Sequence, residues 1–153
     1  MNGPDDLFSA DPESGLVALL DTLIPRSEDG ALPAAGRAGV PAYLALHAAD
    51  LGPLLRAVLA ALDALAAERG AADFASLEPP ERAAVVARHA ERDPLWLPAL
   101  LFHTCAGYYQ QEAVLAALGL PYRPPFPEGY ALEPTDPSLL DGVRQRPRLY
   151  REA

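Results

Sequence analysis

The stretch that decides the fold, residues 94–130, reads PLWLPALLFHTCAGYYQQEAVLAALGLPYRPPFPEGY. Its first part is apolar, and its leucines recur at steps of three and four residues, which predicts a helix. We expect a short turn at 95–97 and one long helix over 98–118, because Pro98 can only begin a helix and Gly119 suits its end. The proline- and tyrosine-rich segment that follows cannot continue the helix.

Working outward from this stretch, four earlier segments also carry apolar residues at helical spacing. They are 11–24, 40–49, 51–69 and 79–92. We expect Asp11 to cap the first of them. The segment 51–69 has the widest apolar stripe, which indicates a central position in the fold.

Between the first two predicted helices, residues 26–37 show no periodic apolar pattern and predict a loop. At the other end of the chain, seven prolines after Gly119 exclude a long helix or a central strand. The segment is instead typical of extended, polyproline-like chain that needs another surface to lie on.

The fold class is therefore all-α: a compact bundle of about five helices with a C-terminal strap rich in proline and tyrosine. We predict a flexible lead over residues 1–10, a helical bundle over 11–120, and an extended strap over 121–153. The strap is expected to pack either on the bundle or on a partner.

The composition narrows the classes of partner. The chain has 153 residues and a formal net charge of −9, and all 12 of its basic residues are arginine. An acidic balance argues against nucleic acid as a partner, because phosphate binding requires a basic face. No apolar run reaches the roughly 18–20 residues of a membrane span, so we expect no direct membrane insertion.

The N-terminal residues lack a basic region, a long apolar region and a twin-arginine motif. On this ground we expect a cytoplasmic protein. A periplasmic location follows only if a twin-arginine signal has been removed or if a partner carries one.

The sequence offers little for catalysis or metal binding. Its single cysteine, Cys105, excludes an internal disulfide and a cysteine-only metal site. No Glu-x-x-His pair, phosphate loop, glycine-rich dinucleotide motif or paired nucleophile and base is present. We therefore expect no catalytic residue, no metal site and no cofactor in this chain; the roles of His47, His89 and His103 stay open.

Tyr108 and Tyr109 are the most informative pair of neighbours. Adjacent residues on a helix diverge by about 100°, so if Tyr108 faces the core, Tyr109 points elsewhere. Either the chain's own strap covers Tyr109, or Tyr109 anchors a partner, since tyrosine is enriched at interface hot spots. The aromatic residues of this region form a candidate partner interface: Tyr109, Tyr122, Phe126 and Tyr130.

Across residues 16–130 the sequence resembles the gluconate 2-dehydrogenase subunit 3 family. The matching pieces occur in order along the chain: Asp21-Thr22-Leu23-Ile24-Pro25, Gly30-Ala31, Ala38-Gly39-Val40 with Tyr43, Phe74 with Leu77, Thr104 with Gly107-Tyr108-Tyr109, Leu118-Gly119, and Pro127-Glu128-Gly129-Tyr130. No single piece is specific; their order and spacing carry the resemblance.

The resemblance implies a small, cofactor-free accessory subunit. Members of the family associate with a large flavin-dependent dehydrogenase of the glucose–methanol–choline type that acts on sugars or polyols, often beside a cytochrome subunit. FAD is then held by the partner, and the small subunit assists its maturation, stability and export. Since members commonly carry a twin-arginine signal and this chain shows none, export of a folded partner by this chain is not implied.

Two alternatives stand beside this interpretation. The chain could be a stand-alone helical module, alone or as a homodimer, with a groove for a small ligand; an open cavity beside Tyr108 and His103 would favour it. It could also be an enzyme or metalloprotein in its own right, which the missing motifs argue against.

Overall fold

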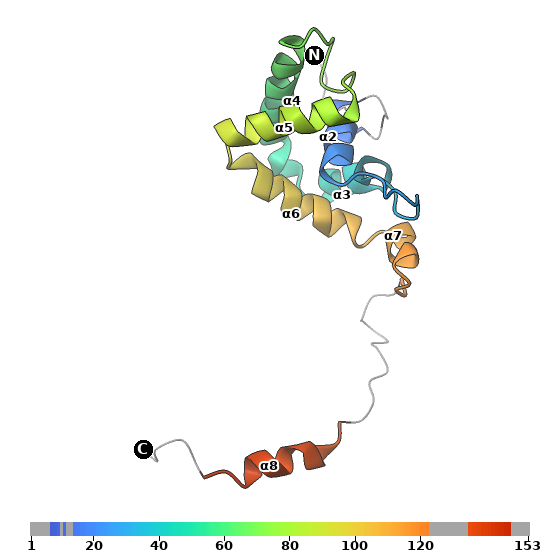
Figure 1. The fold of residues 1–153 in the computed structure, drawn as a ribbon, viewed down its shortest axis with the longest axis vertical. Coiled ribbons are helices and arrows are strands. Elements are labelled where there is room, and N and C mark those ends of the chain that lie inside the picture. The colour runs from blue at the N-terminus through green and yellow to red at the C-terminus, as the bar shows by residue number, and fades with distance from the viewer. Residues whose placement is uncertain (1–6, 10, 12–13, 123–134, 148–153) are drawn as a thin grey trace. The chain divides into compact units, whose positions relative to one another are not determined.

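The computed structural model describes residues 7–9, 11, 14–122 and 135–147. Within these residues all regular structure is helical, which confirms the predicted all-α class. In chain order the elements are α2 (Gly15–Leu23), η1 (Ala35–Arg37), α3 (Val40–His47), η2 (Ala49–Leu51), α4 (Gly52–Ala67), α5 (Pro79–Arg92), α6 (Trp96–Tyr108), α7 (Glu112–Ala117), η3 (Pro137–Leu140) and α8 (Asp141–Arg144), as Figure 1 shows.

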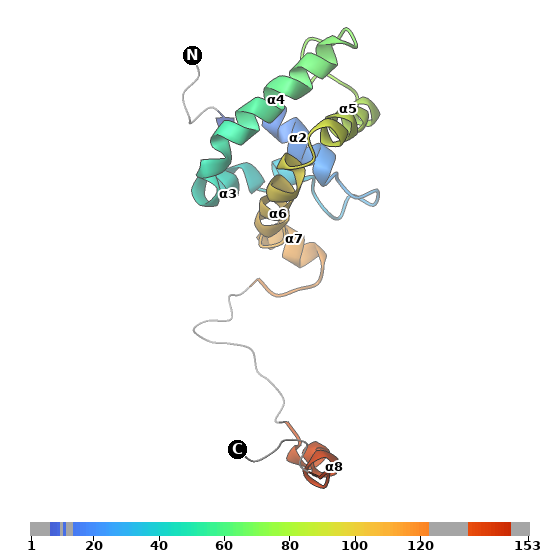
Figure 2. The same cartoon turned by 90° about the vertical axis from the view of Figure 1, so that its left-hand side faces the viewer.

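Helix α2 lies at the centre of the bundle. Five successive residues, 16–20, are buried, so the helix is covered on every side. It contacts α3, α4 and α5, and Figure 2 shows it between them. The prediction that 51–69 is central is wrong. Helix α4 buries only one face, because Arg56 and Asp63 on its other side stay in solvent.

The start of α2 also differs from the prediction. Ser14, not Asp11, caps the helix: its hydroxyl accepts a hydrogen bond from the Val17 N–H at 3.2 Å. Asp11 instead supplies the backbone carbonyl that accepts from the Ser14 N–H at 2.9 Å. Leu7 and Phe8, in the segment predicted as a lead, are half-buried against the core.

Two predicted helix ends are confirmed. Helix α5 begins at Pro79, and its first turn is closed by the Glu81 carboxylate, which accepts from the Glu78 N–H at 3.2 Å. Gly70 follows α4 with φ +80°, a conformation that an L side chain rarely adopts.

The predicted single helix over 98–118 is wrong, because the chain breaks it into α6 and α7. Helix α6 begins at Trp96, so Pro98 falls in the first turn, where a missing N–H costs nothing. At the other end, the Gln111 side-chain amide donates to the Gly107 carbonyl at 2.7 Å. That carbonyl would otherwise accept the backbone N–H of Gln111, so the side chain replaces the bond that would continue the helix.

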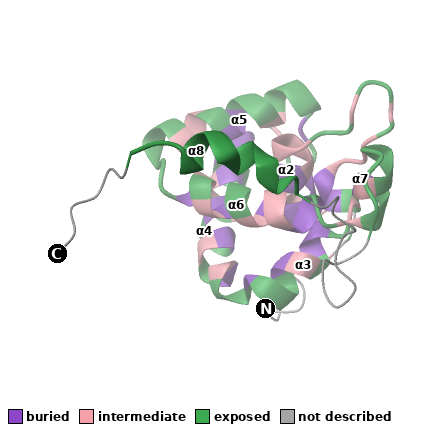
Figure 3. Ribbon diagram, turned by 90° about the horizontal axis from the view of Figure 1, so that it is seen from below, coloured by how far each residue is buried: buried purple, intermediate pink, exposed green. Residues whose placement is uncertain are grey.

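Residues 1–122 and 123–153 form two separate compact units. In the second unit the structure describes η3 and α8, with the Asp136 carboxylate capping η3 through the Ser138 N–H at 2.9 Å. All residues of 135–147 are exposed, as Figure 3 shows for α8. The strap predicted over 121–153 thus contains two short helical turns in its described part.

Among the described residues, no single helix has the length and apolar content to cross a membrane. One bent pair, Val40–His47 with Ala49–Ala67, meets that test only when its two halves are taken together across a 94° bend.

Candidate functional site: a clamped loop and an exposed helix face

Residues 26–39 form a loop between α2 and α3 that is clamped from two helices. From α2, the Asp21 carboxylate accepts from the Gly36 N–H at 2.7 Å. From α6, the Tyr108 hydroxyl donates to the Pro33 carbonyl at 2.7 Å, across 75 residues of sequence. The backbone of Ile24 adds a third bond, accepting from the Ala35 N–H at 3.0 Å. These three bonds fix the second half of the loop against the bundle.

Glycines allow the clamp to close. A Cβ on Gly36 would lie 2.7 Å from the backbone oxygen of Val17 and 2.7 Å from the Asp21 carboxylate. Gly39 ends the loop with φ +81°, directly before α3. A side chain at Gly36 would therefore push the loop off α2.

The two side chains that clamp the loop, Asp21 and Tyr108, both have a raised pKa. Burial raises the pKa of Asp21 above its ordinary value of 3.8, while the Gly36 N–H and the guanidinium groups of Arg37 and Arg82 act in the opposite direction. Arg37 pairs with Asp21 through Nε at 3.8 Å. Burial, with a smaller contribution from Tyr109, also raises the pKa of Tyr108, so its hydroxyl keeps the proton that it donates to Pro33.

The first half of the loop folds on itself. The Asp29 carboxylate accepts from the Ser27 hydroxyl at 2.6 Å and from the Ala31 N–H at 3.0 Å. These two bonds lower the pKa of Asp29. Gly30, with φ +73°, forms the turn between them.

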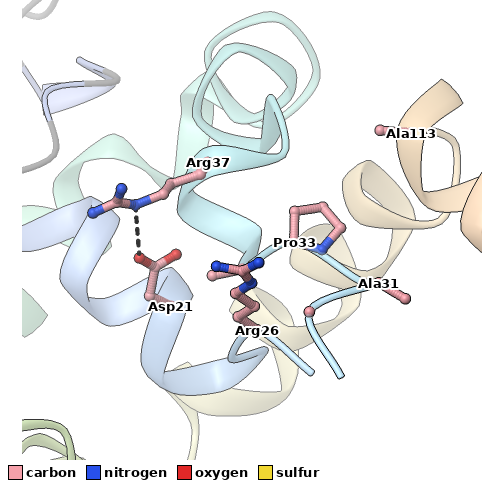
Figure 4. Close-up of a pocket in the computed structure, with 8 residues that line it drawn as sticks. Asp21, Arg26, Ala31, Pro33, Arg37 and Ala113 are labelled. Atoms are coloured by element: carbon pink, nitrogen blue, oxygen red, sulfur yellow. Dashed lines mark ion pairs between the residues drawn. The ribbon is translucent and has the colours of Figure 1, made fainter. Parts of the chain in front are cut away.

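A hollow opens between this loop and α7. It has a volume of about 580 Å³. Its lining combines side chains of α2, the loop and α7: Asp21, Arg26, Gly30, Ala31, Pro33, Ala34, Arg37 and Ala113. In Figure 4 the two arginines extend from opposite ends of the loop, and Ala113 lies across from them on α7.

The second feature is the outer face of α6, formed by Pro98, Leu101, Phe102, Cys105 and Tyr109. Apart from the adjacent Leu101 and Phe102, these residues recur at steps of three and four, so they share one side of the helix, with Tyr109 at its C-cap. Phe102 is 68% exposed and Tyr109 is 54% exposed. The opposite side, with Trp96, Leu100 and Tyr108, is buried in the core.

Helix α6 contains no Asp, Glu, Lys or Arg. A helix that is apolar on all sides is normally covered on all sides. Several exposed apolar residues on one face of a helix typically mark a protein–protein contact, whereas single exposed leucines do not.

The sequence of the chain matches the family model of gluconate 2-dehydrogenase subunit 3 over residues 11–129, well over half its length. This chain belongs to the gluconate 2-dehydrogenase subunit 3 family. Membership makes it a subunit of a dehydrogenase complex. Neither a curated protein nor a solved structure matches it.

The structure brings several of the family-like pieces into one region of this chain. Asp21, the 30–31 turn and Tyr108 all belong to the clamped loop or to its anchors. Gly107 lies against Tyr43: a Cβ on Gly107 would be 2.6 Å from the Tyr43 ring. In this chain these family-like residues serve loop clamping and close helix packing.

The predicted interface residues fall into two groups. Tyr109 and Tyr122 are both exposed, at 54% and 61%. Tyr109 also contacts Tyr108 edge to face, with ring centroids 5.2 Å apart. Phe126 and Tyr130 lie outside the described residues, so their place in an interface stays a prediction.

Sequence reasoning missed three residues of this site, namely Phe102, Arg26 and Arg37. Phe102 was findable, because it lies seven residues before Tyr109 and hence on the same side of a helix. The two arginines stand at the ends of a loop without periodicity, and only the folded loop brings them to one hollow.

Each histidine contacts an aromatic ring. His47 lies 4.6 Å from the Tyr43 ring centroid, and His89 stacks on Trp96 at 5.4 Å. His103 meets Phe102 edge-on at 5.2 Å. Among the residues that the structure describes, no three His, Cys, Asp or Glu side chains gather at metal-binding distance.

The alternative of a ligand cavity beside Tyr108 and His103 gains no support from the hollow beside the loop, nor from a second hollow that adjoins it. The first is lined by the loop and Ala113. The second adjoins it along α7. Tyr108 itself is only 1% exposed and is part of the filled core.

Proposed function

We propose that this chain is a non-catalytic accessory subunit that binds and stabilises the catalytic subunit of its dehydrogenase complex. The observation that carries the proposal is the outer face of α6 in a chain whose family consists of dehydrogenase subunits. Phe102 and Tyr109 are large aromatic residues on a fixed helix, which is the type of side chain that contributes most at interfaces.

The fixed position of this face favours tight binding. The opposite side of α6 is anchored by Trp96, Leu100 and Tyr108, all fully buried. A surface that is already ordered loses little conformational entropy when a partner covers it. A catalytic subunit that binds this surface only in its folded form is stabilised in that form by mass action.

In the proposed complex the partner is a flavin-dependent dehydrogenase of the glucose–methanol–choline type that oxidises sugars or polyols. FAD is bound by that partner, in some complexes beside a cytochrome subunit. The accessory chain supplies no reacting group; it holds the catalytic subunit in its folded, flavin-loaded form. This assignment rests on the family and on the absence of catalytic motifs in the sequence.

Co-expression of this chain with a flavin dehydrogenase of the glucose–methanol–choline type from the same organism tests the proposal. We expect a complex that carries flavin absorbance, with the catalytic subunit less soluble and less flavin-loaded when expressed alone. Two proteins that elute separately, with the dehydrogenase fully active by itself, would contradict the proposal.

Substitutions on α6 identify the surface. Phe102→Ser and Tyr109→Ser each remove an exposed ring, so they should leave folding intact but weaken the complex by about 2 kcal/mol, roughly thirtyfold in Kd. Leu46→Ser is the matched control, because Leu46 is an exposed apolar residue on α3, 77% exposed. Equal effects at all three positions would argue against α6 as the interface.

A further inference from the structure

The bend between α6 and α7 lies in a stretch of sequence that favours an unbroken helix. Residues 108–118 contain neither proline nor glycine, and their apolar residues continue the helical spacing of α6. Most of them are glutamine, glutamate, alanine or leucine, which are good helix formers. A bend that local preference opposes is held by contacts made elsewhere in the fold, and natural chains keep such conflicts mainly where they serve a function.

The change of direction falls at Gln111. Tyr109 and Gln110 form a hydrogen-bonded turn, in which the Gln111 N–H donates to the Tyr108 carbonyl at 3.1 Å. Tyr109 stays beside the helical region, with φ −74° and ψ 0°, whereas Gln111 is extended, with φ −74° and ψ 136°. Because its φ already suits a helix, rotation of ψ at Gln111 toward about −42° would carry α7 into line with α6.

The side chains at the bend make bonds that a straight helix would make through its backbone. The Gln110 amide donates to the Ala106 carbonyl and the Gln111 amide donates to the Gly107 carbonyl, both at 2.7 Å. In an unbroken helix each of these carbonyls accepts the backbone N–H of the same glutamine. Straightening therefore replaces one donor by another at each carbonyl, so these bonds are exchanged and not lost.

Helix α7 is held in its bent position by few contacts. Within Glu112–Ala117, all of which the structure describes, only Val114 is buried. Gln111 stands at the N-cap of α7 but gives it no side-chain hydrogen bond. Its side-chain oxygen instead lies over Gly39, where a Cβ would come within 2.8 Å of it. Six residues are too few for a helix that is stable by itself, so the bent form depends on Val114 and on the side chain of Gln111.

We propose that α6 and α7 meet at a two-state elbow, which is bent when Val114 is in the core and straight when it leaves, with residues 96–118 then forming one helix. The inference concerns this chain alone and does not rest on the proposed function. Straightening gains backbone bonds for the N–H groups of residues 112 and 113, which lack partners within a separate α7. It loses the burial of Val114, so the free chain is mostly bent.

The elbow links the two features of the candidate site. Tyr109, at its α6 end, belongs to the exposed outer face, and Gln111 lies against the clamped loop at Gly39. In the straight form Gln111 leaves Gly39, and α7 takes Ala113 away from the hollow beside the loop. One movement therefore changes both the length of the exposed helix and the wall of the hollow.

A matched pair of double variants tests the elbow. Val114→Ala removes most of the buried side chain, and either Gln111→Ala or Gln111→Ser removes the amide that bonds to Gly107. Serine is a preferred N-cap residue and a weaker helix former than alanine, so it favours the bend, whereas alanine favours the straight helix. The two proteins therefore lack the same contacts and differ only in the preference of residue 111.

NMR of the free chain separates the outcomes. In the Val114→Ala, Gln111→Ala protein, we expect the Cα chemical shifts of residues 110–112 to become helical. The amides of 112 and 113 should exchange about tenfold more slowly than in the serine counterpart, because they then bond to the carbonyls of 108 and 109. Equal shifts and exchange rates in the two proteins would refute the elbow. Loss of helical shifts at 115–117 would also refute it, because α7 would then unfold instead of joining α6.

The single variants repeat the comparison with Val114 in place. In Gln111→Ala, relaxation-dispersion measurements should detect a minor state of about 1% or more with helical Cα shifts at 110–112. Gln111→Ser should populate that state about tenfold less. If Gln111→Ala shows no such state, the elbow is rigid and the proposal fails, even where the double variants do not fold.

Discussion

The two faces of α6 are made of similar residues but have opposite surroundings. The inner face buries Trp96, Leu100 and Tyr108, whereas the outer face leaves Phe102 and Tyr109 exposed. Because the helix contains no Asp, Glu, Lys or Arg, hydrophobicity alone does not say which side meets the core. An apolar residue of α6 thus stabilises this fold only where α3, α5 and the 26–39 loop provide neighbours. Elsewhere on the helix it is available to a partner.

The sharpest way to test this difference is the pair of adjacent leucines at 100 and 101. Leu100→Ala opens a cavity in a filled core, so we expect a loss of about 3 kcal/mol in the free energy of unfolding. Leu101→Ala, at a residue that is 39% exposed, should cost less than about 1 kcal/mol. Urea denaturation of both variants measures the contrast, and equal losses would mean that the outer face is covered within the chain itself.

Gly107 on the inner face tests the closeness of packing. Gly107→Ala places a methyl group 2.6 Å from the Tyr43 ring, so the helices must separate, and we expect a loss of about 2 kcal/mol despite alanine's better helix propensity. Gly142→Ala in α8 is the control, since nothing lies within 4 Å of its Cβ position. It should change stability by no more than about 0.5 kcal/mol; a neutral Gly107→Ala would show that the contact with Tyr43 is loose.

Substitutions at the neighbouring Tyr108 and Tyr109 measure the contribution of the loop clamp apart from that of the outer face of α6. Tyr108→Phe removes the donor to the Pro33 carbonyl without changing the packing of the ring, and should cost about 1 kcal/mol. Tyr109→Phe should leave the free energy of unfolding unchanged. Amide hydrogen exchange should localise the effect of Tyr108→Phe to residues 26–39; faster exchange spread over the whole bundle would speak against a local clamp.

The smallest expected effect concerns Asp21 and appears as a change of folding stability with pH. Its folded pKa lies above the unfolded value of 3.8, so the folded state binds the proton more tightly. The stability that this contributes is present below 3.8 and is lost as the pH rises through the folded pKa. Compared with Asp21→Asn, which keeps an acceptor for the Gly36 N–H, the natural chain should gain relative stability as the pH falls toward 4. Thermal unfolding of both proteins across that range gives the comparison; a relative loss instead would mean that the Arg37 and Gly36 contacts outweigh burial.

Much of the fold could be predicted from the sequence, and each of the exceptions has its own physical cause. The start of α5 at Pro79 and the stop of α4 before Gly70 follow from local preferences of proline and glycine. The break after Tyr108 does not, because the apolar spacing continues through it and the interruption comes from one side-chain hydrogen bond, Gln111 to Gly107. The central place of α2 was also missed, since a nine-residue helix shows too little sequence to reveal that it is covered on every side.

The residues of the site also divide into those that could be predicted from the sequence and those that could not. Tyr109 was predicted as a candidate contact from sequence, because two adjacent helical residues cannot both face one core. The role of Asp21 and the presence of Arg26 and Arg37 in one hollow depend on where a non-periodic loop lies, and no spacing rule describes such a loop.

By itself, the sequence determined that this protein is helical, that its C-terminal segment leaves the helical pattern after Gly119, and that it carries the family pattern of a dehydrogenase subunit. These properties depend on local backbone preference and residue order, which a linear chain already contains. Only the tertiary structure decided which face of α6 is left uncovered and how the 26–39 loop is clamped to α2 and α6. Both depend on contacts between residues as far apart as Pro33 and Tyr108, and such contacts exist only once the chain has folded.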